Sequence, residues 1–311
     1  MRLENKKPKL IVLLGPTACG KTSWSLRLAK KISGEIISAD SRQIYKKMDI
    51  GTAKEPGEWR RAGLRRTFFI QDIPHHLIDF LDPGKRFTAA QFRDKALKYI
   101  KLSFKNGRQP MIVGGTGLYI SAIVDNLRIP RVEPNNKLRE SLEEKSVDEL
   151  FKLLESLDKK SAESIDKNNK RRVIRALEVS ILSGQPFSEQ RLKGEELFNC
   201  LKIGIDLPRE ELYARIDRRV EEMMKNGLLE EVEKLRQQKY GWDLQSMSGI
   251  NYRQFKDYFA GKKTFPETVE LLKKDTKNYA KRQMTWFGRD KEIKWRQSYE
   301  EAEKLVKEFL V

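Results

Sequence analysis

The chain has 311 residues, of which 39% are hydrophobic and 35% are charged, and its formal net charge at pH 7 is +18. This length and composition predict a polar globular protein with a substantial core and room for a second, smaller domain. The excess of Lys and Arg favours a polyanionic partner, with nucleic acid ahead of an anionic membrane; a merely basic surface is the alternative.

The cysteines and the first apolar run exclude two further classes of protein. Cys19 and Cys200 are too few for a disulfide framework and lack the spacing of metal ligands. The run Leu10–Leu14 is far too short for the core of a signal peptide or for a membrane span. We therefore expect a reducing, cytoplasmic protein without a membrane segment.

The first third of the chain alternates short apolar runs with helical sequence. Leu10–Leu14, Glu35–Ala39 and Gln109–Val113 have the length of buried strands, and Lys21–Ile32 has the pattern of a helix. Short apolar strands that alternate with helices form parallel sheets covered on both faces. The pattern therefore predicts an α/β core.

The middle of the chain is polar, strongly charged and helical. Pro130 opens this stretch, and Gly184 with Pro186 closes its last helix. Leucines recur in it at helical spacing, at Leu138, Leu142, Leu150, Leu153, Leu154 and Leu157. We interpret it as a helical insertion domain, residues 130–196, within a catalytic core made of residues 1–129 and 197–311.

The last third of the chain is predicted to return to the core and to be mostly helical. Cys200–Asp206 is strand-like and is expected to rejoin the sheet, and a short run at Ile293–Trp295 precedes the last helix. The predicted helices are Arg209–Asn226, Leu228–Gln238, Tyr252–Ala260, Pro266–Phe287 and Tyr299–Leu310.

The most specific short motif is a phosphate-binding loop at Gly15–Thr22, which matches G-x-x-x-x-G-K-[ST] between a predicted strand and a predicted helix. Glycines let backbone N–H groups turn toward phosphate oxygens, and the helix N-terminus adds a positive dipole. Lys21 supplies a charge, and the Thr22 hydroxyl can ligate Mg²⁺. The loop predicts phosphate binding without specifying the reaction, because most P-loop proteins transfer or hydrolyse a phosphoryl group.

Asp40 follows the predicted strand Glu35–Ala39, so its carboxylate is expected at the edge of the sheet where ligands bind. Three interpretations of this residue are open. It could hold Mg²⁺ as the acidic residue of a kinase, act as a general base, or cap the N-terminus of a helix.

Seven blocks of sequence carry a resemblance to a known family. They are Gly15–Thr22, Ser38–Tyr45, Met48–Lys54, Pro74–Asp79, Gly114–Tyr119, Arg171–Glu178 and Arg282–Phe287. Together they span nearly the whole chain and resemble the bacterial tRNA dimethylallyltransferases, the tRNA isopentenyltransferase family. The resemblance implies a P-loop NTPase-like parallel sheet with a helical insertion and a helix-rich C-terminal part.

The resemblance also implies a prenyl transfer. The P-loop would hold dimethylallyl diphosphate with Mg²⁺, and N6 of the adenosine on the 3′ side of the anticodon would attack the allylic carbon. Asp40 corresponds to the family's general base, which a weakly nucleophilic amine needs; Lys21, Thr17 and Arg219 complete the implied catalytic set. The implied diphosphate ligands are Gly15, Pro16, Thr17, Ala18, Cys19, Gly20, Lys21, Thr22 and Thr116, with Mg²⁺ on Thr22.

A tRNA anticodon stem-loop is the implied macromolecular partner. The residues predicted to contact it are Asp40, Ser41, Arg42, Gln43, Thr116, Arg139, Arg171, Arg172, Arg175, Arg253, Lys281 and Arg282. Basic residues beside Trp286 suit phosphate contact with base stacking; in the alternative, Trp286 and Phe287 lie in the core and the charges are only solvated. The chain departs from the family at Asn251, where glycine is usual, and at Gly288, where arginine is frequent.

The two histidines, His75 and His76, are not expected to bind a metal, because adjacent side chains diverge and zinc takes about four ligands. We expect a structural or substrate-lining loop at this position, and no zinc. Three other functions stay open: a P-loop kinase of a small metabolite, a non-catalytic RNA-binding protein, and a prenyltransferase of free adenine nucleotides.

Overall fold

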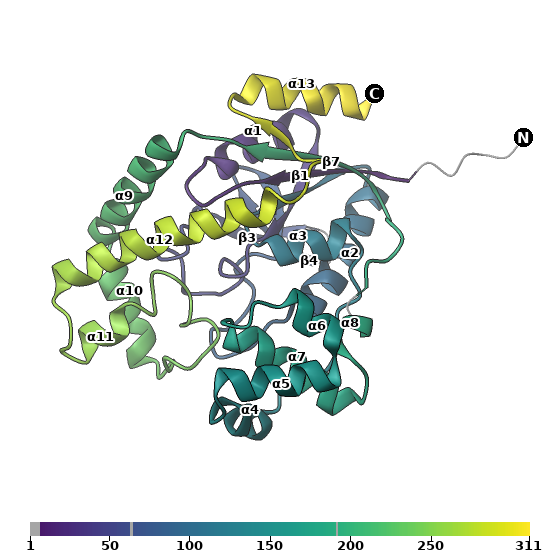
Figure 1. Ribbon diagram of the computed structural model, residues 1–311. Helices are drawn as coiled ribbons and strands as arrows, with labels where there is room; N and C mark the ends of the chain where they lie inside the picture. Colours follow the sequence, from purple (N-terminus) through teal and green to yellow (C-terminus); the bar gives the residue numbers. More distant parts are fainter. Residues whose placement is uncertain (1–6, 63–64, 191) are drawn as a thin grey trace, which may run out of the picture. The chain divides into compact units, whose positions relative to one another are not determined.

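The computed structural model describes residues 7–62, 65–190 and 192–311 (Figure 1). The chain divides into two compact units, Met1–Ile120 with Leu197–Val311, and Ser121–Glu196. The second unit thus begins before the predicted position 130. Its ends are paired with each other, since the Arg128 N–H donates to Leu192 O at 2.9 Å and the Gly194 N–H donates to Asn126 O at 3.2 Å. These backbone bonds group the residues just before 130 with the insertion.

The first unit is built on a single mixed sheet. Its strands are β1 (Lys9–Leu14), β2 (Gly34–Ala39), β3 (Glu58–Ala62), β4 (Arg65–Ile70), β5 (Ile73–His76), β6 (Gln109–Gly114), β7 (Asn199–Ile205) and β8 (Lys294–Arg296). Within the described residues the strand order is β3-β4-β5-β2-β6-β1-β7-β8, and all pairs from β5 to β8 are parallel. Each strand that the sequence predicts is present, with ends shifted by one residue or so.

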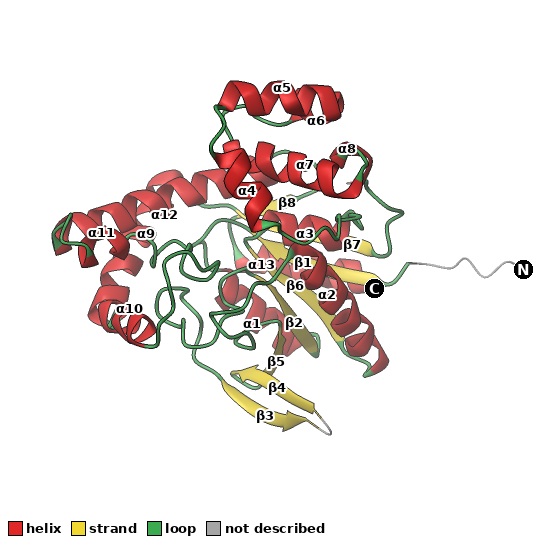
Figure 2. Ribbon diagram, turned by 90° about the horizontal axis from the view of Figure 1, so that it is seen from below, coloured by secondary structure: helices red, strands yellow, loops and turns green. Residues whose placement is uncertain are grey.

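The hairpin formed by β3 and β4 was not predicted from the sequence. It pairs in antiparallel fashion at one edge of the sheet, where Figure 2 shows it projecting beside β5. Its strands contain Trp59 and Phe68 but also Arg60, Arg61 and Arg66. Edge strands commonly carry such charges, which removes the apolar run that identifies a buried strand.

Helices cover both faces of the central strands. Those of the first unit are α1 (Lys21–Lys31), α2 (Ala89–Lys105), α9 (Arg209–Lys225), α10 (Leu228–Gln237), α11 (Phe255–Phe259), α12 (Phe265–Phe287) and α13 (Tyr299–Leu310), and α3 (Gly117–Val124) crosses the division between the units. β2 contacts both α1 and α2, and its adjacent residues Ile36 and Ile37, which point to opposite faces of the sheet, are both buried. Burial on both faces explains why the strands are continuous apolar runs.

The second unit is a small helical bundle. It contains α4 (Asn136–Glu143), α5 (Val147–Leu157), α6 (Lys159–Ser164), α7 (Lys170–Ser183) and α8 (Phe187–Gln190). Its core includes Leu142, Leu150 and Leu154 from the predicted leucine pattern, whereas Leu157 is 41% exposed at the end of α5. α7 ends as predicted at Gly184, whose φ of 69° is left-handed and suits glycine.

Candidate active site

The phosphate-binding loop connects β1 to α1 at the carboxyl edge of the sheet. Gly15 has a φ of 148° and Gly20 a φ of 99°, values that favour glycine. A Cβ on Gly15 would lie 2.9 Å from Cys19 Sγ. Lys21 folds back over the loop, and its Nζ donates to the carbonyl oxygens of Gly15 at 3.0 Å and Pro16 at 2.6 Å. The ammonium group therefore lies inside the loop, where it can exchange these carbonyls for phosphate oxygens.

Arg219 lies on α9 and is brought to the same loop by the fold. Burial lowers the pKa of its guanidinium, and electrostatic interactions with Cys19, Glu222 and Glu55 oppose that shift. Within the described residues, its side chain has neither an ion pair nor a hydrogen bond. A half-buried cation that has no ion pair within the described residues and lies beside a phosphate loop is suited to bind an anion.

Asp40 follows β2, which is two strands away from β1 in the order β2-β6-β1. Its Oδ1 accepts hydrogen bonds from the N–H groups of Arg42 at 2.7 Å and Gln43 at 3.2 Å. Asp40 therefore caps a turn, and not the N-terminus of a helix, which was one of the three roles left open by the sequence. In the part of the chain that the structure describes, no hydrogen bond reaches Oδ2, so this half-exposed carboxylate keeps one oxygen available to accept a proton.

Thr116 joins the turn at Asp40 to the loop that follows β6. Its N–H donates to Ala39 O at 3.1 Å, and its Oγ1 accepts from the Ser41 N–H at 3.1 Å. Tyr279 of α12 hydrogen-bonds with Thr116, and burial, followed by the negative charge of Asp40, raises the pKa of Tyr279 to about 12. The sequence analysis missed Tyr279, because a tyrosine inside a helix is no motif by itself; its position just before the Arg282–Phe287 block was the available sign.

Two of the predicted tRNA contacts hold protein backbone. Arg42 Nη1 donates to the carbonyl oxygen of Gln245. Gln43 Nε2 donates to the carbonyl oxygens of Thr52 and Ala53, both at 3.2 Å. These side chains brace the turn that carries Asp40, and they reach RNA only by giving up those partners.

A glutamate on α10, which the sequence analysis missed, anchors the loop between residues 48 and 54. Glu231 accepts from the N–H groups of Asp49 at 2.7 Å, Ile50 at 2.8 Å and Gly51 at 3.0 Å, and from the Tyr252 hydroxyl at 2.7 Å. This loop supplies the carbonyls that hold Gln43. The position of this loop therefore depends on a helix almost two hundred residues further along the chain. No local sequence pattern predicts such a contact.

The two departures from the family pattern have different backbone consequences. Asn251 has a φ of 74°, and asparagine is among the residues that tolerate this left-handed conformation. Its Nδ2 also donates to Gly51 O at 2.9 Å, so the side chain adds a contact that glycine would lack. Gly288 has a helical φ of −63°, which any residue adopts.

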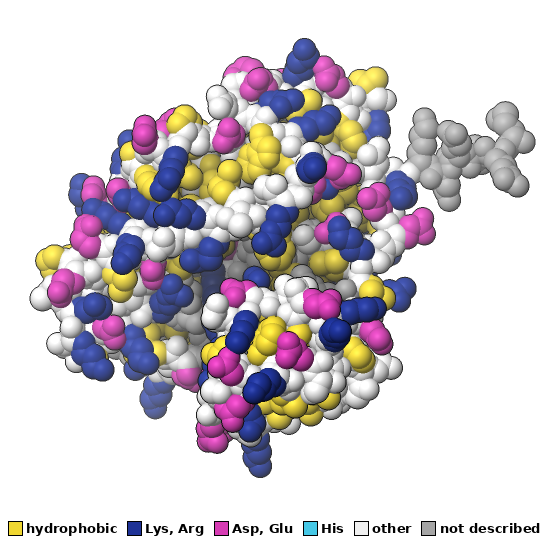
Figure 3. All heavy atoms as spheres, viewed as in Figure 1, with side chains coloured by type: hydrophobic (Ala, Val, Ile, Leu, Met, Phe, Trp, Pro, Cys, Tyr) yellow, Lys and Arg dark blue, Asp and Glu magenta, His cyan; other side chains and the backbone are white. Residues whose placement is uncertain are grey.

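The basic residues near the end of α12 differ in exposure from the aromatic residues beside them. Lys281 and Arg282 are exposed. Lys and Arg side chains are spread over the face shown in Figure 3. Trp286 packs on Gly117, where an added Cβ would overlap the indole, and Phe287 is buried. Phe287 thus follows the core alternative, whereas Trp286 is only half-buried. Of the other predicted contacts, Arg253 is paired with Asp275 at 2.8 Å.

The four arginines predicted to bind RNA in the second unit fall into two groups. Arg171 and Arg172 are exposed at the start of α7. Arg139 and Arg175 instead form ion pairs, at 2.7 and 2.5 Å, with Glu178, whose side chain is fully buried. Hydrogen bonds from both arginines lower the pKa of Glu178 against the effect of its burial. The second group therefore compensates a buried charge within the unit.

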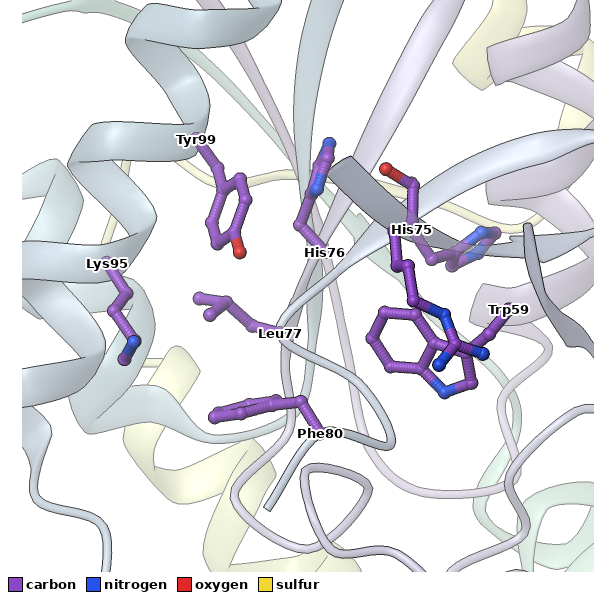
Figure 4. A pocket seen from close by; sticks show the side chains of 9 residues that line it. Trp59, His75, His76, Leu77, Phe80, Lys95 and Tyr99 are labelled. Carbon is purple, nitrogen blue, oxygen red and sulfur yellow. The ribbon is translucent and has the colours of Figure 1, made fainter. Parts of the chain in front are cut away.

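His75 and His76 lie in β5, a strand, and not in the loop that the sequence analysis expected. The alternating pattern of a four-residue strand is too short to identify it. His76 Nε2 lies 2.9 Å from Glu35 Oε2, and burial lowers the pKa of His75 to about 4. A cavity of about 60 Å³ beside them is lined by Trp59, Phe80, Lys95 and Tyr99 among others (Figure 4). It has room for a few water molecules, but not for a nucleotide.

Among the described residues, no group of three or more His, Cys, Asp or Glu side chains is placed to hold a metal ion. In the same residues, no helix is both long enough and apolar enough to cross a membrane.

Comparison with known proteins finds similarity along most of the chain. The family model for IPP transferase matches residues 43–290. A tRNA dimethylallyltransferase of Roseiflexus sp. (strain RS-1) is 45% identical over 284 residues, which are 90% of each chain. The crystal structure of a tRNA isopentenylpyrophosphate transferase from Bacillus halodurans has a TM-score of 0.69 at 37% identity, covering 98% of this chain and 96% of that one. The structure of a eukaryotic dimethylallyltransferase acting on tRNA has a TM-score of 0.70 at 28% identity, covering 90% of this chain and 70% of that one.

Proposed function

The chain belongs to the IPP transferase family, the tRNA dimethylallyltransferases, and we propose that it transfers a dimethylallyl group from dimethylallyl diphosphate to N6 of an adenosine in tRNA. We further propose that this adenosine is the one on the 3′ side of the anticodon. We also propose that the reaction takes place in the cytoplasm.

The observation that carries the proposal is the arrangement of Asp40 and the P-loop at one edge of the sheet. They follow β2 and β1, with β6 between them. Two strand spacings separate them by about 10 Å. A five-carbon diphosphate can bridge this gap, with its phosphates in the loop and its allylic carbon toward the carboxylate. A phosphoryl-transfer enzyme would instead need its acidic residue at the phosphates.

The P-loop side of the site is suited to bind a diphosphate and to stabilise it as a leaving group. Lys21 and Arg219 supply two cations, and the N-terminus of α1 supplies N–H groups. The Thr22 hydroxyl is exposed at this helix start. One hydroxyl with diphosphate oxygens and water suits Mg²⁺, which usually takes few protein ligands. When bound there, Mg²⁺ would neutralise charge on the departing diphosphate.

Asp40 supplies the base in the proposed reaction. The lone pair of N6 forms the new bond to C1 of the dimethylallyl group, and the C–O bond breaks so that diphosphate leaves with its electron pair. Asp40 Oδ2 takes the proton that N6 loses. The hydrogen bonds to Oδ1 hold the carboxylate in one orientation while Oδ2 stays free.

The RNA-binding part of the proposal rests on exposed basic residues. Arg171 and Arg172 on α7, together with Lys281 and Arg282 on α12, are free to contact phosphates. An adenosine stacked in an anticodon loop must swing out to reach Asp40. We propose that these residues hold the stem-loop while the base is extruded.

The decisive experiment is incubation with dimethylallyl diphosphate, Mg²⁺ and an unmodified tRNA transcript, followed by mass spectrometry of the nucleosides. We expect N6-dimethylallyladenosine, and none from a transcript that has guanosine at the target position. Hydrolysis of ATP without prenylation would favour the kinase, and tRNA binding without turnover the RNA-binding protein. Prenylation of free AMP in preference to tRNA would identify the nucleotide prenyltransferase.

A further inference from the structure

A single side chain of α12 contacts two loops of the active site. Gln283 is only 6% exposed. Its Oε1 accepts from the N–H of Thr17 in the P-loop at 2.8 Å, and its Nε2 donates to the carbonyl oxygen of Gly115 at 2.9 Å. Both ends of the buried amide are thus satisfied by the backbones of two different loops. Such a bridge fixes the loops relative to each other, because breaking either bond leaves a buried polar group unpaired.

The loop after β6 is shaped to receive α12. An added Cβ on Gly115 would overlap Gln283 Nε2, and one on Gly117 would overlap the Trp286 indole. Neither glycine has a positive φ. Their absent side chains therefore serve the close approach of the helix, not an unusual backbone conformation. Gly115 and Gly117 therefore form a packing surface for α12.

Hydrogen bonds and the peptide bond between Gly115 and Thr116 connect this contact to the turn that carries Asp40. Thr116, next to Gly115, bonds to Ala39 O and to the Ser41 N–H, each at 3.1 Å. Asp40 lies between those two residues. The P-loop, Gln283, the loop after β6 and the turn at Asp40 are therefore connected through single hydrogen bonds.

We propose that Gln283 is a positioning residue that sets the separation between the diphosphate in the P-loop and the carboxylate of Asp40. This inference rests on the proposed function, since a transfer between two substrates needs both ends of the site at a fixed distance. Gln283 touches neither the reacting carbon nor the proton; it acts through Thr17 and Gly115. Its loss should slow the chemical step more than it weakens the binding of either substrate.

The test is the Gln283→Met variant, which keeps the length of the side chain and removes both hydrogen bonds. We expect the single-turnover rate constant, at saturating dimethylallyl diphosphate and tRNA, to fall about 10- to 100-fold, the loss typical of misplacement by about 1 Å. The dissociation constants of inorganic diphosphate and of tRNA should stay close to those of the wild type. A merely structural role would lower the melting temperature and the active fraction, and leave the rate constant of the active molecules unchanged.

Gln109→Met is the matched control, because Gln109 Nε2 also bridges two neighbouring strands, donating to Lys9 O at 2.9 Å, but at the opposite, amino edge of the sheet. It should retain the wild-type rate constant. Gly115→Ala displaces Gln283 from the other side of the contact and should reproduce the loss. The double variant with Gln283→Met should be no slower than the slower single variant, because both changes break the same link.

An undiminished rate constant in folded Gln283→Met, or losses that multiply in the double variant, would overturn the inference. Should Gln283→Met fail to fold, Gly115→Ala decides by the same rate comparison. A wild-type protein that prenylates no tRNA would remove the proposed function together with the inference, whereas a prenylating wild type with an unaffected variant removes the inference alone.

Discussion

The phosphate-binding loop and helix α7 both carry basic residues that the sequence assigned to an anionic ligand, but the structure uses these residues differently. In the loop, Lys21 donates to carbonyl oxygens of its own loop, and Arg219, which α9 brings beside the loop, has no ion pair among the described residues. On α7, Arg175 is committed to the buried Glu178, while Arg171 and Arg172 are exposed. The two cations at the loop are available to a ligand. The arginines of α7 are divided between exposed positions and a buried ion pair.

The difference follows from how each segment constrains its side chains. A phosphate loop fixes the backbone so closely that the direction of its lysine follows from the motif. A helix turns each successive side chain about 100° around its axis. Neighbouring arginines on α7 therefore face different surroundings, and their charges alone do not distinguish an RNA contact from the partner of a buried carboxylate.

The largest effect is expected from a substitution of Asp40, the proposed general base. Asp40→Asn keeps the shape and the capping oxygen but removes the base, so turnover should fall about 10²- to 10⁴-fold. Affinity for tRNA should change little. Rates from single-turnover assays and tRNA binding by filter retention measure the two quantities, with Asp243→Asn, at an exposed position, as the control. Near-normal turnover of Asp40→Asn would show that another group takes the proton.

A smaller loss is expected at Lys21. Lys21→Ala removes a charge-assisted contact to the diphosphate, so kcat/KM for dimethylallyl diphosphate should fall about 10- to 100-fold, with both kcat and KM affected. Lys30→Ala removes a lysine from the exposed surface of the same helix and should leave both parameters unchanged. If the two variants behave alike, the diphosphate does not bind in this loop.

The sequence predicted the parts of the fold and site that local patterns determine. The strands are continuous apolar runs, the P-loop is a motif with defined flanks, and Asp40 ends a recognisable strand. The β3–β4 hairpin was not predicted, because its charged edge strands have no apolar run. His75 and His76 were placed in a loop for a related reason, since β5 has only four residues.

The residues that hold the loops of the site in place were not predicted for a different reason. Their contacts join positions far apart in the sequence. Glu231 reaches the N–H of Gly51 at 3.0 Å, and Gln283 reaches that of Thr17 at 2.8 Å. No spacing rule connects residues so far apart in sequence. Glu178 shows the same limit in the second unit, since its burial is what commits Arg139 and Arg175. A sequence reveals which charges exist but not which of them a buried partner has taken.

The division among the α7 arginines can be tested on stability first. Arg175→Ala leaves Glu178 with Arg139 and the Asn135 N–H as partners. We expect the free energy of unfolding of the second unit to drop by about 1–3 kcal/mol, the usual cost of losing a hydrogen bond to a charged, buried group. Urea denaturation followed by circular dichroism measures the drop. Arg172→Ala, one helical turn away and exposed, is the control. Equal stability of the two variants would mean that Glu178 does not depend on Arg175.

The smallest effect is expected from the two exposed arginines, and it concerns salt dependence. If Arg171 and Arg172 contact phosphates, the double alanine variant should release fewer counterions when it binds tRNA. Each lost contact should reduce the log–log slope of affinity against salt by about 0.7 to 0.9. Affinity for dimethylallyl diphosphate should not change, because these residues lie outside the unit that contains the P-loop. Titration of tRNA at several salt concentrations measures the slope. Replacing Lys159 and Lys160, two exposed lysines of α6, controls for charge alone. Identical slopes for both double variants would remove α7 from the RNA interface and leave Lys281 and Arg282 as its candidates.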